Sequence, residues 1–76
     1  MRDLIEHIAK ALVDDPDGVE VTEFGDDEAS IIKLKVSKSD LGKVIGKKGR
    51  TAKAMRTLLS ACATKLRKRS MLEIIE

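Results

Sequence analysis

Two glycines bracket two lysines near the middle of the chain, in the segment Gly46-Lys47-Lys48-Gly49. The apolar pair Val44-Ile45 precedes this segment, and a helical pattern over residues 51–66 follows it. Glycine permits left-handed backbone and lets another backbone come close. The helix that follows presents unpaired N–H groups and the positive end of its dipole, which favour an anion such as a phosphate. The alternative is a plain corner between two helices with solvated lysines.

The spacing of the glycines separates this segment from the common nucleotide-binding motifs. A P-loop needs four residues between its glycines and a hydroxyl residue after its lysine, whereas three residues separate Gly42 from Gly46 and Lys48 follows Lys47. A dinucleotide fingerprint needs a strand directly upstream, where this chain has a short helical pattern. What remains is a Gly-x-x-Gly loop between two helices, which clamps the backbone of about four single-stranded nucleotides.

The charges of the chain are segregated, although its net charge is only +2. Residues 33–69 hold thirteen Lys and Arg residues and one acid, Asp40, whereas residues 1–32 hold two bases and ten acids. A basic half of this kind is typical of a protein that binds a polyanion. Solvated lysines on a helix face are the alternative explanation.

Reactive side chains are few, which argues against an enzyme. His7, the only histidine, lies outside the apolar stripe of its helix and is predicted to be solvated. Cys62, the only cysteine, is predicted to be a small buried apolar residue, and a lone cysteine suits a reducing compartment such as the cytoplasm. No apolar run approaches the ~18 residues that cross a bilayer. We therefore expect no catalytic residue, metal, cofactor or membrane partner.

Apolar periodicity predicts six elements in a single α+β domain spanning residues 1–76. Helical patterns cover about residues 2–14, 37–45 and 50–66 (or 68), and alternating patterns predict strands at 19–24, 31–36 and 71–75. The order α-β-β-α-α-β predicts three helices packed on a three-stranded mixed sheet. The first two strands, joined by the short turn 25–28, should form an antiparallel hairpin. If the last strand lies beside the second, the crossover between them makes the two parallel.

Two local features are predicted with alternatives. Ser37 or Ser39 is the predicted cap of the second helix. Phe24, the only aromatic residue, lies on the strand face opposite Val19 and Val21. It marks either a bulge or a lid over the edge of the sheet.

The third helix is apolar over more of its surface than packing on one sheet requires. Its predicted core stripe is Ala52, Met55, Leu59, Cys62, Ala63 and Leu66. Ala54, Leu58 and Ala61 extend this stripe to one side, and we expect them to contact a second copy of the chain. A partly exposed apolar flank is the alternative. The basic residues Lys65, Arg67, Lys68 and Arg69 at its end either extend a nucleic-acid track or favour the helix terminus through its dipole.

The segment from Val44 to Arg50, within this order of elements, resembles the K-homology (KH) domain of type II. The continuation from Thr51 to Leu59 is most similar to the small stand-alone bacterial KH proteins of the KhpA type. The resemblance covers the whole chain. It implies single-stranded RNA binding in the cytoplasm, self-association, pairing with a larger KH-containing protein, and a link to cell division and cell-wall growth.

The resemblance also implies roles for particular residues. Gly46 and Gly49 let the RNA backbone approach, while Lys47 and Lys48 reach its phosphates. Val44 and Ile45 contribute to an apolar wall for the bases, and Lys43, Arg50 and Lys53 add charge nearby. The second strand, near Ile32 to Lys35, lines the other side of the groove. The turn from Gly25 to Glu28 corresponds to the family's variable loop, and its acidic residues would repel phosphate from that side.

Aromatic residues make up only 1% of the chain. Without a stacking platform, bases must be held by aliphatic contacts and hydrogen bonds. Affinity for RNA should therefore be modest, largely electrostatic and sensitive to salt, and a dimer or a partner would raise it by linking two sites. The alternative function is a protein-interaction adaptor whose helix-mediated dimer surface matters more than RNA binding.

Overall fold

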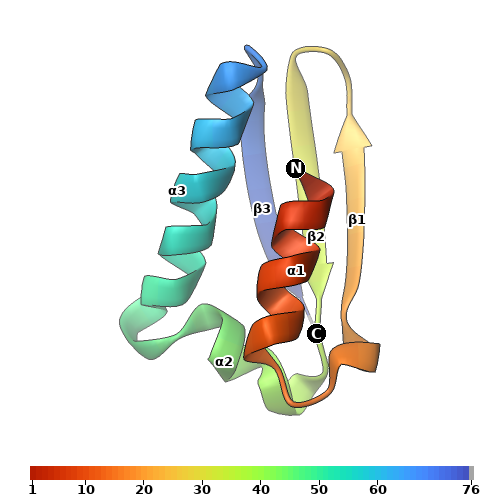
Figure 1. Ribbon diagram of the computed structural model, residues 1–76, viewed down its shortest axis with the longest axis vertical. Helices are drawn as coiled ribbons and strands as arrows, with labels where there is room; N and C mark the ends of the chain where they lie inside the picture. The colour runs from red at the N-terminus through yellow and green to blue at the C-terminus, as the bar shows by residue number, and fades with distance from the viewer. Residues whose placement is uncertain (76) are drawn as a thin grey trace.

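The computed structural model describes residues 1–75 and has the α-β-β-α-α-β order that the sequence predicts (Figure 1). The elements are α1 (Arg2–Leu12), β1 (Glu20–Gly25), β2 (Ala29–Lys35), α2 (Leu41–Ile45), α3 (Arg50–Lys65) and β3 (Arg69–Ile75). Short 3₁₀ turns at Pro16–Gly18, Lys38–Asp40 and Lys47–Gly49 join several of them. The arrangement is that of a type II KH domain.

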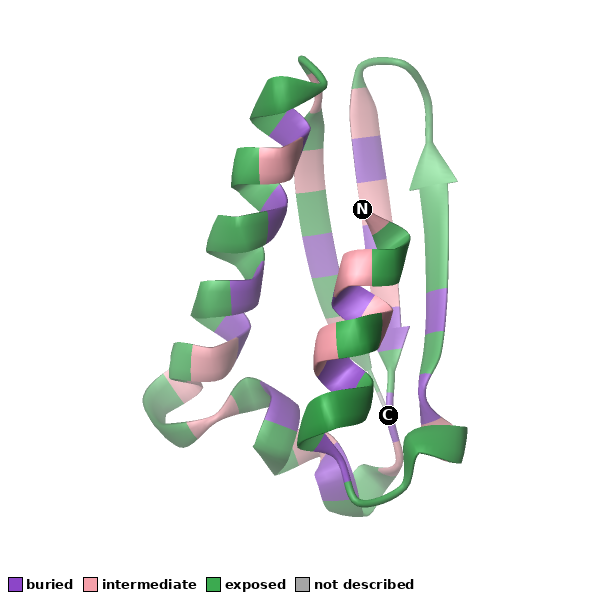
Figure 2. Cartoon of the chain, viewed as in Figure 1, coloured by how far each residue is buried: buried purple, intermediate pink, exposed green. Residues whose placement is uncertain are grey.

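The three strands form one mixed sheet in the order β1-β2-β3. The β1 strand pairs with β2 in antiparallel register, with Val21 opposite Leu34, and β2 pairs with β3 in parallel register, with Leu34 opposite Ile74. The predicted hairpin and the predicted parallel pair are both confirmed. The helices lie on one face of the sheet, and the buried residues of α1 and α3 are on the sides that face it (Figure 2).

The core lies between this sheet face and the helices. Alternation along β2 places Ile32 and Leu34 inward, where both are fully buried, while Lys33 and Lys35 point to the uncovered face. From the helix side the core receives Ile5, Ala9, Val44, Met55 and Leu59. Removing this apolar surface from water is the main stabilising contribution to folding.

Several boundaries and burial predictions are wrong in detail. The α1 helix ends at Leu12, because Val13 is already extended (φ −91°, ψ 158°). The β2 and β3 strands each begin two residues earlier than predicted. Within the predicted core stripe of α3, Cys62 is only partly buried and Leu66 is 60% exposed, since α3 is in contact with the sheet along a narrower face.

Of the two alternatives for Phe24, the bulge is wrong. The register between β1 and β2 is unbroken from Glu20 to Gly25, so Phe24 sits opposite Ile31 without a bulge. Phe24 is 43% exposed on the uncovered face of the sheet, in the edge strand β1, and the Lys33 ammonium lies 5.3 Å from the ring centroid.

The predicted serine cap is also absent. Neither Ser37 nor Ser39 caps α2 through its side chain, and the N-cap position of α2 is Asp40. The Ser37 hydroxyl instead donates a hydrogen bond to Asp15 Oδ2 at 2.7 Å.

Asp40 is almost completely buried and ties the segment after α1 to the start of α2. Its carboxylate accepts hydrogen bonds from the backbone N–H groups of Asp14, at 3.3 Å, and Asp15, at 3.1 Å. The Lys43 ammonium lies 3.6 Å from Asp40 Oδ1 and compensates the buried charge. A buried carboxylate that is hydrogen-bonded and paired in this way holds two distant segments in one geometry.

Replacing Asp40 by Ala should lower the free energy of unfolding by about 2–4 kcal/mol, because two backbone N–H groups lose their acceptor. Urea denaturation measures this change. Asp17→Ala removes an exposed carboxylate from the same segment and should change the free energy of unfolding by less than about 0.5 kcal/mol. Equal effects of the two substitutions would show that Asp40 is not an anchor.

Candidate nucleic-acid interface

The Gly46–Gly49 loop has a backbone that depends on its two glycines. Gly46 adopts φ 77° and ψ 172°, a region that is essentially restricted to glycine, and Gly49 adopts the left-handed conformation at φ 74°. Lys48 is also left-handed, at φ 57°. The Gly49 N–H donates to the Gly46 carbonyl at 3.1 Å and closes the loop as a single tight turn.

The two glycines face different surroundings. A Cβ on Gly46 would lie 2.2 Å from Thr51 Oγ1 and 2.9 Å from the Thr51 backbone nitrogen, so Gly46 is needed where the loop packs on the first turn of α3. A Cβ on Gly49 would meet no heavy atom of the described residues within 4 Å, apart from its immediate chain neighbours. Gly46 therefore shapes the loop, while Gly49 presents open backbone to solvent.

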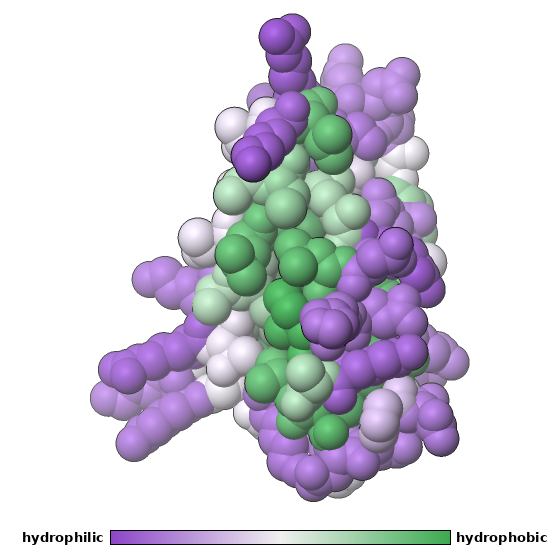
Figure 3. All heavy atoms as spheres, in the orientation of Figure 1, coloured by the Kyte–Doolittle hydropathy of each residue, from purple (hydrophilic) through white to green (hydrophobic). Residues whose placement is uncertain are grey.

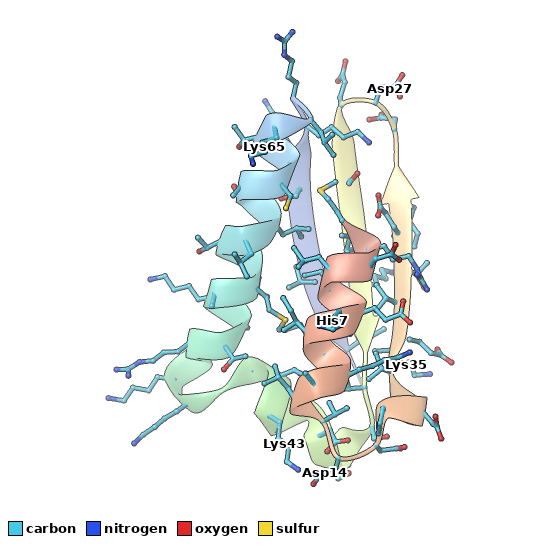
Figure 4. The ribbon with its side chains drawn as sticks, viewed as in Figure 1. His7, Asp14, Asp27, Lys35, Lys43 and Lys65 are labelled. Atoms are coloured by element: carbon cyan, nitrogen blue, oxygen red, sulfur yellow. The ribbon has the colours of Figure 1, made fainter. Side chains whose placement is uncertain are left out.

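Cationic side chains surround the loop and stay free. Lys47, Lys48, Arg50 and Lys53 are exposed, and none of the four forms an ion pair within residues 1–75. Long basic side chains extend into solvent beside the start of α3 (Figure 4). The N-terminus of α3 has no side-chain cap, and residues 41–72 contain no acid. The loop thus combines free cations, unpaired N–H groups and the positive end of a helix dipole.

Lys43 is committed to the fold. Its ammonium pairs with Asp14 and lies near Asp40, and the hydrogen bond to Asp14 raises the pKa of Lys43. Lys43 and Asp14 lie together at the lower end of Figure 4. Because its ammonium is already paired with carboxylates, Lys43 is less available to bind a phosphate than the sequence predicts.

The two apolar residues before the loop differ in burial. Val44 is fully buried in the core, so its predicted place in a wall for bases is wrong. Ile45 is 38% exposed and is the one of the pair that solvent reaches. The short α2 helix explains the difference, since neighbouring residues point about 100° apart around a helix.

The strand beside α3 is β3, and the expectation that residues 32–35 line a groove is wrong. The β2 strand is central in the sheet and is paired on both sides, so it has no free edge. A hollow of about 310 Å³ instead lies between α3 and the free edge of β3, lined by Arg56, Leu59, Ser60, Ser70, Met71 and Leu72. Arg56 Nη2 donates to the Leu72 carbonyl at 3.4 Å. In the sequence, only the predicted crossover between β2 and β3 pointed to this hollow, because it placed β3 beside β2 and therefore at an edge of the sheet.

The acidic turn between β1 and β2 lies at the opposite end of the molecule from the Gly46–Gly49 loop (Figure 1). It faces the chain that follows α3, where the Arg69 N–H donates to the Glu28 carbonyl at 2.9 Å. The backbone N–H groups of Glu28 and Ala29 lower the pKa of Asp26, and nearby Lys68 adds to the effect. These acids therefore do not border the Gly46–Gly49 loop, and they lie instead beside the basic residues that follow α3.

The outer side of α3 is apolar. Ala54 and Ala61 are exposed, Leu58 is 49% exposed, and a hollow of about 510 Å³ is lined by Arg50, Lys53, Ala54, Thr57 and Leu58. Figure 3 shows apolar surface running along this face of the molecule over α1 and α3.

Other kinds of site find little support in the described part of the chain. Within residues 1–75, no three His, Cys, Asp or Glu side chains gather as a metal site requires. None of the helices in those residues is both long and apolar enough to span a membrane. His7 is exposed on α1, as predicted.

Comparison with known proteins identifies close relatives over the whole chain. Residues 2–74 match the family described as "KhpA/KhpB, KH domain". Proteins named RNA-binding protein KhpA are similar to this chain in Caldanaerobacter subterraneus subsp. tengcongensis, with 56% identity over 99% of this chain and 100% of the relative, and in Halalkalibacterium halodurans, with 54% identity over 100% of both. A third, from Aquifex aeolicus, is 49% identical over 100% of this chain and 96% of the relative. No solved structure matches the chain.

Substituting Ala at the two glycines should have unequal effects. Gly46→Ala should lower the free energy of unfolding by about 3 kcal/mol or more, because it adds a clash with Thr51 to an unfavourable φ. Gly49→Ala should cost only about 1–2 kcal/mol, since its Cβ points into open space. Thermal or urea denaturation gives both values. A Gly46→Ala variant as stable as Gly49→Ala would contradict the assigned packing.

Proposed function

The chain belongs to the KhpA/KhpB family of KH domains, and we propose that it is a non-catalytic protein that binds single-stranded RNA through its Gly46–Gly49 loop. The observation that carries this proposal is the pair of exposed, unpaired lysines, Lys47 and Lys48, beside the open backbone of Gly49. The relatives are named RNA-binding proteins, which supports RNA as the ligand class.

The RNA backbone would approach at Gly49, where no side chain stands in the way. Lys47 and Lys48 would neutralise phosphates, and Arg50 and Lys53 would add charge from the first turns of α3. Ammonium and guanidinium groups release counterions when they neutralise phosphates, which makes binding favourable and salt-dependent. About four nucleotides fit a loop of this kind.

The bases would then lie toward the hollow between α3 and the free edge of β3. That edge offers backbone N–H and C=O groups that no strand pairs within residues 1–75, and Met71 and the Arg56 stem offer aliphatic contact. Phe24 lies on the uncovered face of the sheet, so stacking on an aromatic ring does not contribute here. Affinity should be modest for this reason.

A second copy of the chain would raise that affinity. We propose that Ala54, Leu58 and Ala61 form the dimer contact, supported by the apolar hollow on the outer side of α3. Small residues beside one large apolar residue let two helices pack closely. A larger KH-containing protein could occupy the same surface in a heterodimer, and the adaptor function is the outcome in which this contact persists without RNA binding. The cellular setting we propose is cytoplasmic post-transcriptional regulation linked to cell division and cell-wall growth.

Replacing Lys47 and Lys48 by Gln should weaken binding of a short single-stranded RNA by tenfold or more at low salt. The slope of log K against log salt concentration should fall by about 1.4, since two phosphate contacts are lost. Fluorescence polarisation at several salt concentrations measures both quantities.

The matched control, Lys33→Gln/Lys35→Gln, removes two charges from the uncovered face of the sheet and should leave the salt slope unchanged. Equal losses of RNA affinity in the two variants would mean that binding depends only on the net charge of the protein. Unchanged binding in the loop variant would favour the adaptor function.

Leu58→Asp should convert a dimer into a monomer in sedimentation-velocity experiments, because it places a charge at the centre of the apolar contact. Ile75→Asp is the matched control, since Ile75 is 42% exposed but lies on the uncovered face of the sheet. A Leu58→Asp variant that keeps the wild-type mass would rule out this surface.

A further inference from the structure

A second basic cluster lies where α3 ends, far from the Gly46–Gly49 loop. It consists of Lys65, Arg67, Lys68 and Arg69. Two backbone hydrogen bonds hold the chain here: the Lys68 N–H donates to the Ala63 carbonyl at 2.8 Å, and the Arg69 N–H donates to the Glu28 carbonyl. Arg67 has φ 58°, a left-handed conformation that glycine usually fills after a helix. The chain therefore presents an arginine at a position where a glycine would cost less free energy.

Most of this charge is not used by the fold. Lys68 Nζ donates to Ser30 Oγ at 3.3 Å and compensates the nearby Asp26. Lys65, Arg67 and Arg69 are exposed and form no ion pair within residues 1–75. Interaction with the helix dipole accounts for Lys65 in the last turn, but that effect fades within one turn and does not extend to Arg69 in β3.

The cluster borders a hollow of about 470 Å³, lined by Glu28, Ala29, Arg67, Lys68 and Arg69. Glu28 is the one acid in this lining, against three cations. The volume is sufficient for a phosphate group with its sugar.

One face of α3 connects the loop to this cluster. Lys53, Arg56, Ser60 and Thr64 follow one another at intervals of three or four residues within α3, so they share a face, and Arg67 follows just beyond the end of the helix. Arg56 and Ser60 line the hollow beside β3, which shows that this face borders the free strand edge. Because residues 41–72 contain no acid, no carboxylate of these elements interrupts the path.

The length of α3 sets how much RNA the path would take. Its sixteen residues span about 24 Å at about 1.5 Å per residue. A stacked strand advances about 3.4 Å per nucleotide, so roughly seven nucleotides cover that distance. The Gly-x-x-Gly loop alone holds about four.

We propose that the RNA-binding surface continues from the Gly46–Gly49 loop along this face of α3 to a second phosphate-binding site at Arg67 and Arg69. This extension rests on the proposed function and adds a footprint of about seven nucleotides. The basic cluster then serves nucleic-acid binding, in addition to its favourable interaction with the dipole at the end of α3.

Oligouridylates of four and eight nucleotides separate the two levels of the proposal. A four-nucleotide site can bind an eight-nucleotide RNA in five registers, which alone raises the apparent affinity roughly fivefold. The wild type should bind the longer RNA more tightly than the shorter one by a larger factor than this. Arg67→Gln/Arg69→Gln should remove the excess gain and lower the salt slope by about 1.4 for the longer RNA only. Binding of the shorter RNA should be unchanged.

Arg67→Gly/Arg69→Gln removes the same charges and relieves the left-handed arginine, so backbone strain at residue 67 cannot account for a loss of affinity in this variant. Lys47→Gln/Lys48→Gln should weaken both RNAs. If the arginine variants bind the longer RNA as tightly as the wild type, the extension is wrong and the proposed function stands. If the wild type binds neither RNA, both are wrong.

Discussion

The close contact between Gly46 and the first turn of α3 is the constraint on which the candidate site depends. Since Gly46 has no side chain, Thr51 can lie against its Cα, and the chain can leave α2 and enter α3 within four residues. Asp40 holds α2 itself to the segment after α1. The loop is therefore anchored at both ends to packed elements. A site on such elements keeps its geometry better than one on a free loop.

The same contacts determine which cations are paired within the fold and which remain free. Lys43 and Asp40 satisfy each other at the base of α2 and are withdrawn from binding, whereas the cations of the loop and of the first turns of α3 are left free. The acids of residues 26–28 are held at the other end of the sheet by the β1–β2 hairpin. A nearly neutral protein thus carries a basic surface along α3, and such a surface attracts a polyanion even when the net charge is small.

One-sided coverage of the sheet explains the remaining exposed apolar surface. Three helices cover one face of the sheet with a core of few residues, as expected for a chain of 76 residues. Within residues 1–75 of a single copy, no element covers the outer side of α3 or the sheet face that carries Phe24 and Lys33. A second copy packed on the α3 surface would bury apolar surface that the small core cannot.

The sequence by itself determined the order and type of the elements, the Gly46–Gly49 loop and the segregation of charge. Those features follow from local patterns: apolar periodicity, glycine spacing and the composition of each half. The tertiary structure alone decided which strand borders α3, where the acidic turn lies, and that Val44 is buried. It also decided that Lys43 pairs with Asp14, a residue 29 positions away. These outcomes depend on how segments distant in the chain meet in space, and local periodicity carries no information about that.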